Sequence, residues 1–210
     1  MTPRLLALLL LCLALTARAE GAERPSRADL QKVLELYERS VVRVHGPRRA
    51  GPGVIVGSGG QVLTSVDHVS LETADVEFGG QRVTGSVMLA NAYLKIAVVT
   101  APSGIYPSVP VKVIPEGLAG QWLIGVIQGR GKKAVSMPFT AVARGAKGGA
   151  KGGSNEPFVD VDLPLPPGSP LFDVSGRLVA LVVQRQGGGC RALPLASVKL
   201  QLATTAAGAP

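Results

Sequence analysis

The feature that most constrains the fold is a long series of short apolar segments separated by turns. Ten such segments, bounded by glycine- or proline-containing turns, lie at residues 41–46, 53–57, 61–65, 75–80, 81–89, 95–101, 121–129, 139–145, 158–163 and 177–185. Short apolar runs with no helices between them are typical of antiparallel strands and argue against a parallel sheet. The 27 glycines and 16 prolines supply the tight turns that such a fold needs. The sequence therefore predicts an all-β barrel or sandwich.

Helical patterns occur only at the two ends of this strand series. Residues 26–40 form the one long amphipathic pattern, which Ser26 can cap and whose apolar residues recur three and four positions apart, at Leu30, Val33, Leu34 and Tyr37. Leu195 to Leu202 predicts a short closing helix, and residues 203–210 predict a flexible tail. The repeat GAKGGAKGG at 145–153 has no apolar anchor, so we expect a mobile basic loop.

The first 19 residues have the pattern of a secretory signal peptide. Arg4 gives a basic start, an apolar run extends from Leu5 to Leu15, and Ala17-Arg18-Ala19 is a small-x-small cleavage site. The run is shorter than the roughly 20 residues of a membrane span. We therefore expect an exported protein, periplasmic or secreted, with no stable membrane anchor after cleavage. Cleavage leaves Cys190 as the one cysteine, so the mature fold depends on its core and not on a disulfide.

Four segments in chain order carry a resemblance to a known family. They are GVIVGSGGQVLTSVDHV (53–69), LKIAVVTAP (94–102), GQWLIGVIQGRGKKAVSMPFTAVARG (120–145) and FVDVDLPLPPGSPLFDVSGRLVALVV (158–183). Together they resemble the patterns L-T-x-x-H-V, D-L-A-V and N-P-G-N-S-G-G-P-L of trypsin-like serine proteases, closest to the HtrA-type bacterial branch. The resemblance covers about residues 38–202.

This resemblance implies an all-β fold of two antiparallel six-stranded β-barrels, with one N-terminal helix and a short C-terminal helix. It also implies a division of the chain into a helical segment at 20–40 and a protease domain at 41–202, after the signal peptide at 1–19. Within that domain we expect barrels at about 41–103 and about 116–195.

The resemblance assigns the general base to His68, which follows the second hairpin strand. Catalysis in this family needs a serine nucleophile, a histidine that takes its proton, a carboxylate that orients the histidine, and backbone N–H groups that bind the oxyanion. The sequence departs from this set because Lys95 stands where the D-L-A-V pattern has Asp. A cation there would lower the pKa of His68 and would not stabilise an imidazolium. Three residues, where the family has two, separate Thr64 from His68.

The nucleophile turn also departs from the family pattern. When the family pattern is aligned on Pro170-Leu171, the family serine corresponds to Pro167. When the pattern is aligned on Pro167-Gly168 instead, this sequence lacks three residues of the pattern, and Ser169 replaces its last glycine. If Ser169 is the nucleophile, the two glycines after it are missing. Proline has no N–H and a fixed φ, so it cannot supply an oxyanion donor. The alternative is an ordinary Pro-Gly turn in which Ser169 makes a local hydrogen bond.

These departures predict an exported pseudoprotease that binds a peptide or protein ligand through the former substrate cleft. Two alternatives stay open. One is an active serine endopeptidase that uses His68 and Ser169. The other is a surface protein that binds a polyanion through its basic residues, namely Arg48, Arg49, Arg130, Lys132, Lys133, Arg144, Lys147 and Lys151.

Three classes of ligand are not expected. The basic segments are not interleaved with aromatic residues, so the sequence does not predict specific nucleic-acid binding. Two histidines and one mature cysteine argue against a metal site of a common type. No dinucleotide or phosphate-binding fingerprint is present, so no cofactor is expected.

Overall fold

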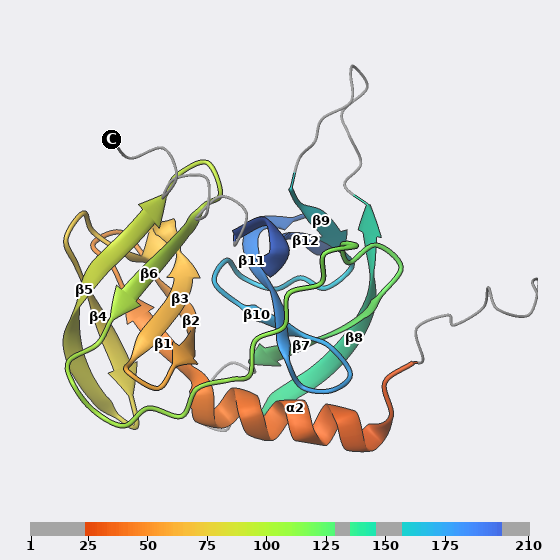
Figure 1. Ribbon diagram of the computed structural model, residues 1–210, viewed down its shortest axis with the longest axis horizontal. Helices are drawn as coiled ribbons and strands as arrows, with labels where there is room; N and C mark the ends of the chain where they lie inside the picture. The colour runs from red at the N-terminus through yellow and green to blue at the C-terminus, as the bar shows by residue number, and fades with distance from the viewer. Residues whose placement is uncertain (1–23, 129–134, 146–156, 199–210) are drawn as a thin grey trace, which may run out of the picture.

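The computed structural model describes residues 24–128, 135–145 and 157–198 (Figure 1). The predicted signal peptide and tail lie outside these residues, as does all but the first residue of the predicted loop at 145–153. In the part of the chain that the structure describes, no helix is long and apolar enough to cross a membrane.

The described residues form two closed antiparallel β-barrels of six strands each (Figure 1). Barrel 1 has the strand order β1-β2-β3-β6-β5-β4 and consists of β1 (Val41–His45), β2 (Ala50–Gly57), β3 (Gln61–Ser65), β4 (Thr73–Phe78), β5 (Gln81–Asn91) and β6 (Ile96–Thr100). Barrel 2 has the order β10-β11-β12-β9-β8-β7 and consists of β7 (Trp122–Gln128), β8 (Ser136–Gly145), β9 (Val159–Val161), β10 (Pro170–Phe172), β11 (Leu178–Gln186) and β12 (Gly189–Pro194). The prediction of two six-stranded antiparallel barrels is confirmed.

Two strands of barrel 2 were not among the ten predicted from the sequence. β10 has only three residues and begins at a proline, and its apolar residues are buried by pairing with β11 and β7. β12 begins at the last of three consecutive glycines, and its buried Cys190 and Ala192 alternate with the half-buried Gly189 and Arg191. Tertiary pairing determines β10, because three residues are too few to show a period of their own, whereas in β12 Gly189 and Arg191 interrupt the apolar residues.

The predicted helix at 26–40 is confirmed as α2 (Arg27–Ser40). A reciprocal capping box starts it, since Asp29 N donates to Ser26 Oγ at 3.2 Å and Ser26 N donates to Asp29 Oδ2 at 2.8 Å. Val33 and Tyr37 are buried against the barrels, and burial raises the pKa of Tyr37 to about 12. A short helix at 195–198 begins where the closing helix was predicted, and the rest of that predicted range lies outside the described residues.

A continuous apolar core joins the two barrels and α2. Residues from each part belong to one buried cluster, including Val54 and Leu63 of barrel 1, Ile124 and Phe172 of barrel 2, and Val33 of α2. The segment between β6 and β7 also links the barrels through hydrogen bonds from Val109 N to Ile55 O at 2.9 Å and from Leu178 N to Pro110 O at 2.8 Å. The candidate site residues therefore sit at a junction whose two sides are held together by the core.

Candidate active site

His68 lies directly after β3 at the end of a single 3₁₀ turn, η1 (Val66–His68). Ser65 Oγ caps this turn by accepting a hydrogen bond from Asp67 N at 3.3 Å. Because His68 lies beyond the end of the strand, the alternation of side chains along β3 does not determine which way it points. The imidazole is almost fully enclosed, with 4% of His68 exposed.

Thr64 holds the His68 ring in one orientation. Thr64 Oγ1 donates its only proton to the carbonyl oxygen of Pro52 at 2.8 Å, and the same oxygen lies 3.1 Å from His68 Nδ1. Since that hydroxyl has no second proton to give, Nδ1 carries the proton and donates it to Thr64. Nε2 is then left with the lone pair that a general base needs. The family motif does not point to Thr64 as a partner of the ring, although Thr64 stands four residues before His68.

Glycines from both barrels enclose the His68 ring. A Cβ added at Gly51 of β2 would lie 2.1 Å from His68 Cε1 and 2.2 Å from Nε2. A Cβ added at Gly168 of barrel 2 would lie 3.1 Å from Cε1 and 2.1 Å from the carbonyl oxygen of Pro52. Only residues without a side chain allow so close an approach. The ring is therefore packed into the junction between the barrels, and its Nε2 faces the backbone of Gly51.

Burial is the main cause of a lowered pKa for His68. The neighbouring Asp67 carboxylate and the Pro52 carbonyl raise the pKa, while the Arg49 guanidinium lowers it further. We expected a lowered pKa from the cation at position 95. The direction agrees, but the contributing cation is Arg49, on the turn between β1 and β2. The pKa direction means that His68 is neutral at neutral pH.

The motif alignment put Lys95 at the position of the family carboxylate, and in the structure its amine points to barrel 2. It lies directly before β6 with a φ of 57°, and Nζ donates to Gln184 Oε1 on β11 at 2.8 Å. Its carbonyl oxygen accepts a hydrogen bond from Val66 N at 3.2 Å, so the backbone of Lys95 supports the turn that carries His68. The group that orients the His68 ring is therefore the neutral hydroxyl of Thr64, and no carboxylate takes that part among the described residues.

The candidate nucleophile turn uses all of its backbone donors within the fold. Gly168 has a φ of 84°, and Ser169 N donates to Pro166 O at 3.2 Å, which closes a type II turn with Pro167 and Gly168 at its centre. Gly168 N donates to the carbonyl oxygen of Val182 at 2.7 Å, and Val182 N donates back to Ser169 O at 2.9 Å. Prolines at 166, 167 and 170 have no N–H. From 166 to 170, no N–H remains to bind an oxyanion.

Ser169 is buried, with 2% of its surface exposed. The turn brings the neighbouring Gly168 against the His68 ring, but among the described residues no hydrogen bond joins Ser169 Oγ to His68. The assignment of His68 and Ser169 as a catalytic pair stays a prediction.

The overall architecture matches solved structures of serine proteases. The Rv3671c protease of M. tuberculosis H37Rv, in its inactive form, is 20% identical and superposes with a TM-score of 0.65 over 87% of this chain and 98% of that chain. A serine endoprotease from Yersinia pestis is 16% identical, with a TM-score of 0.66 over 87% of this chain and 67% of that chain. The HtrA-type protease AlgW, solved with a tripeptide, is 18% identical, with a TM-score of 0.62 over 84% of this chain and 63% of that chain.

The chain has the two-barrel fold of trypsin-like serine proteases. No protein-family model matches the sequence, and no curated protein matches it either. At identities of 20% and below, the structural likeness establishes the fold alone, so the chemistry must be judged from the residues at the junction of the barrels.

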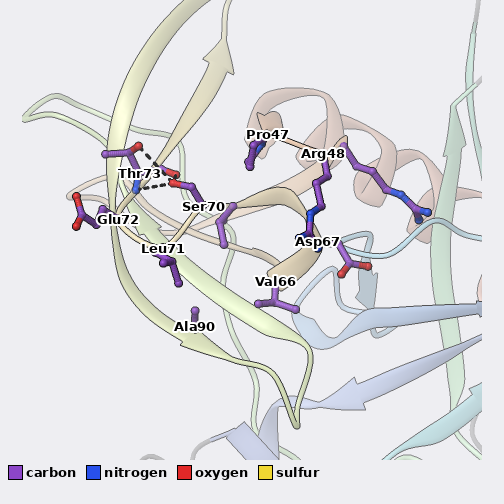
Figure 2. Close-up of a pocket in the computed structure, with 11 residues that line it drawn as sticks. Pro47, Arg48, Val66, Asp67, Ser70, Leu71, Glu72, Thr73 and Ala90 are labelled. Atoms are coloured by element: carbon purple, nitrogen blue, oxygen red, sulfur yellow. Dashed lines mark hydrogen bonds between the residues drawn. The ribbon is translucent and has the colours of Figure 1, made fainter.

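A cavity opens beside the His68 turn on the side of barrel 1 (Figure 2). Its volume is about 870 Å³, within the range of ligand pockets. It is lined by the turn between β1 and β2, by η1 and by the loop that leads to β4, through the residues Pro47, Arg48, Arg49, Val66, Asp67, Val69, Ser70, Leu71, Glu72, Thr73 and Ala90. Within the described ranges, no group of three or more His, Cys, Asp or Glu side chains is placed to hold a metal ion.

Proposed function

We propose that this protein is an exported pseudoprotease of the trypsin-like fold that binds a peptide or protein ligand beside the former catalytic centre. The observation that carries this proposal is the turn from 166 to 170, in which three prolines have no N–H and the two remaining N–H groups are already bonded. A tetrahedral intermediate formed here would have no backbone donor from this turn.

The positions of the nucleophile and of the orienting carboxylate also support a loss of acyl-transfer activity. The alignment on Pro170-Leu171 puts Pro167 at the position of the nucleophile, and proline has no hydroxyl to attack a carbonyl. Loss of one oxyanion donor costs about 10²–10³ in kcat, and loss of the orienting carboxylate costs about 10⁴ in the well-studied enzyme of this fold. A neutral Thr64 hydroxyl cannot replace the carboxylate charge that stabilises an imidazolium.

Two features support a binding role and an exported location. The cavity beside the His68 turn has the volume of a ligand pocket and is lined by both charged and apolar residues, which supports a binding role. Export is proposed from the N-terminal sequence alone, since residues 1–19 combine a basic start, an apolar run and a small-x-small cleavage site.

The polyanion alternative has less support. Arg144, one of its basic residues, is already paired with Asp162. The active-endopeptidase alternative needs Ser169 to reach His68, and no hydrogen bond within the described residues supports that reach.

A fluorophosphonate probe tests the proposal directly, because it forms a covalent adduct only with an activated serine. We expect no labelling of the purified protein under conditions in which trypsin is labelled completely. Labelling that disappears in Ser169→Ala would contradict the pseudoprotease proposal. The binding half of the proposal is tested by panning a random peptide library on the same preparation, and failure to enrich any peptide sequence would count against it.

A further inference from the structure

Two arginines on one turn give the cavity beside His68 an anion-binding end. Arg48 and Arg49 line the cavity from the turn between β1 and β2, and neither makes an ion pair with a described residue. Guanidinium groups form bidentate hydrogen bonds with carboxylates, which makes arginine the usual residue for recognising planar anions. Arg49 also lies close enough to His68 to lower the pKa of the imidazole, so this end of the cavity adjoins the former catalytic centre.

A rigid turn holds an exposed leucine at the cavity wall. Ser70 N donates to Thr73 O at 3.1 Å, and Thr73 N donates to Ser70 Oγ at 3.0 Å, so the loop from 70 to 73 closes on itself. Val87 N ties this loop to β5 by donating to Glu72 O at 2.8 Å. Leu71, at the tip of the loop, is 95% exposed. Because Leu71 lines the cavity and its side chain is open to solvent, it offers an aliphatic contact to a ligand there.

The cavity continues the apolar surface of Leu71 toward the arginines. Val66, Val69 and Ala90 add apolar groups to its lining. Figure 2 shows Arg48 on one side of the cavity and Glu72 on the opposite side, with Leu71 between them. A ligand that fits this order of groups has an anion at the arginine end and an aliphatic group beside it.

The acidic residues of the cavity restrict what can bind at each end. Glu72 lies at the end away from Arg48, so its charge does not cancel the guanidinium groups at close range. Asp67 lies on the same side as Arg48 and makes no ion pair with a described residue. Its carboxylate lowers the positive potential there, which favours a single carboxylate over a densely charged polyanion.

We propose that this cavity binds an extended peptide segment that carries a carboxylate next to an aliphatic side chain. The carboxylate pairs with Arg48 and Arg49, and the aliphatic side chain packs on Leu71 and Val69. This inference rests on the proposed peptide-binding function and specifies its ligand. The carboxylate comes either from an Asp or Glu side chain or from the free C-terminus of the segment.

The test is fluorescence anisotropy with labelled hexapeptides and the purified protein. One peptide has an internal Asp beside Leu and an amidated C-terminus, a second ends in Leu with a free carboxylate, and a third has Asn and an amidated end. We expect one of the first two peptides to bind about tenfold more tightly than the third, and the difference to shrink as salt is raised. Which of the two binds identifies the source of the carboxylate.

Variants locate the binding in the cavity. Arg48→Ala with Arg49→Ala should remove most of the preference for the carboxylate peptide, a loss of about two- to fivefold for each arginine. Arg27→Ala, at an exposed position on α2, makes the same change of charge per residue and should leave binding unchanged. Leu71→Ser should weaken all peptides that carry leucine, and Asp67→Asn should strengthen binding of the carboxylate peptide.

Equal affinity for the carboxylate and Asn peptides, or a double arginine variant that binds like Arg27→Ala, would overturn the inference. Tighter binding of heparin than of any peptide, lost in the same double variant, would also overturn it in favour of a polyanion site. In each case the pseudoprotease proposal stands if the fluorophosphonate probe still fails to label Ser169. Labelling of Ser169 would defeat the proposed function whatever the peptides do.

Discussion

Replacing Gly168 by alanine is expected to weaken the junction between the two barrels. Gly168 has a φ of 84°, and an added Cβ would lie 2.1 Å from the Pro52 carbonyl oxygen of barrel 1. That oxygen belongs to the backbone, so it has no rotamer by which to move away. The turn must then shift relative to β2, and the His68 ring between them must shift as well, since its Cε1 would be 3.1 Å from the new methyl group.

Two costs contribute to the expected loss of stability. A left-handed backbone costs an alanine about 1–2 kcal/mol. Forcing a methyl group into a close-packed contact costs about 1–3 kcal/mol. Together they predict that Gly168→Ala lowers the free energy of unfolding by about 2–5 kcal/mol, a large part of the stability of a typical domain.

Urea unfolding followed by the fluorescence of Trp122, the one tryptophan of the chain, measures this loss. Gly117 provides the matched control, because its φ is 85° and no atom lies within 4 Å of a Cβ added there. Gly117→Ala should show only the backbone cost of about 1–2 kcal/mol. If the two variants differ by less than about 0.5 kcal/mol, close approach at Gly168 does not hold the barrels together and the reasoning is refuted.

Three further predictions concern buried groups. Thr64→Val removes the hydroxyl between Pro52 and His68 and should lower the free energy of unfolding by about 1–3 kcal/mol. ¹⁵N NMR of the variant should show a mixture of His68 tautomers, and a single unchanged tautomer would contradict this prediction. Because the pKa of His68 is lowered in the fold, the unfolded chain binds a proton before the folded protein does as pH falls below about 6.5. The free energy of unfolding should therefore decrease from about pH 6.5 down to the folded pKa, by up to about 1.4 kcal/mol per pH unit. His68→Asn should flatten a profile of the urea midpoint against pH over that range. Burial raises the pKa of Cys190 to about 12. Peptide mapping after iodoacetamide treatment at pH 8 should therefore find Cys190 unmodified in the native protein and alkylated in urea. Alkylation in the native protein would contradict this prediction, because it would show that the thiol is accessible.

Local patterns predicted those parts of the fold that depend on local chemistry. The helix from Arg27 to Ser40 follows from the Ser26–Asp29 capping box and from apolar residues at helical spacing, both of which are visible in the sequence. The strands of barrel 1 follow from apolar runs between turns. β10 could not be predicted in this way, because three residues from Pro170 to Phe172 show no period and the partner strands determine their conformation. β12 was missed because Gly189 and Arg191 interrupt its apolar residues.

The environment of His68 was the least predictable part. The motif put His68 at the position of the base and Lys95 at the position of the carboxylate, and both statements concern sequence order alone. The partner of the ring is Thr64, and its walls are Gly51 and Gly168, which lie far apart in the sequence. Only the closure of both barrels brings these residues together. The direction of the Lys95 amine toward Gln184 likewise depends on β11, a strand of the other barrel.

The most direct test of the account is ¹¹B NMR of a peptidyl boronate added to the purified protein. Boronates become tetrahedral when a serine hydroxyl adds to boron, and backbone donors then stabilise the oxygen that carries the charge. Because the turn around Ser169 has no free N–H from 166 to 170, we predict that the boronate stays trigonal at saturating protein. A tetrahedral signal that is lost in Ser169→Ala would contradict the account.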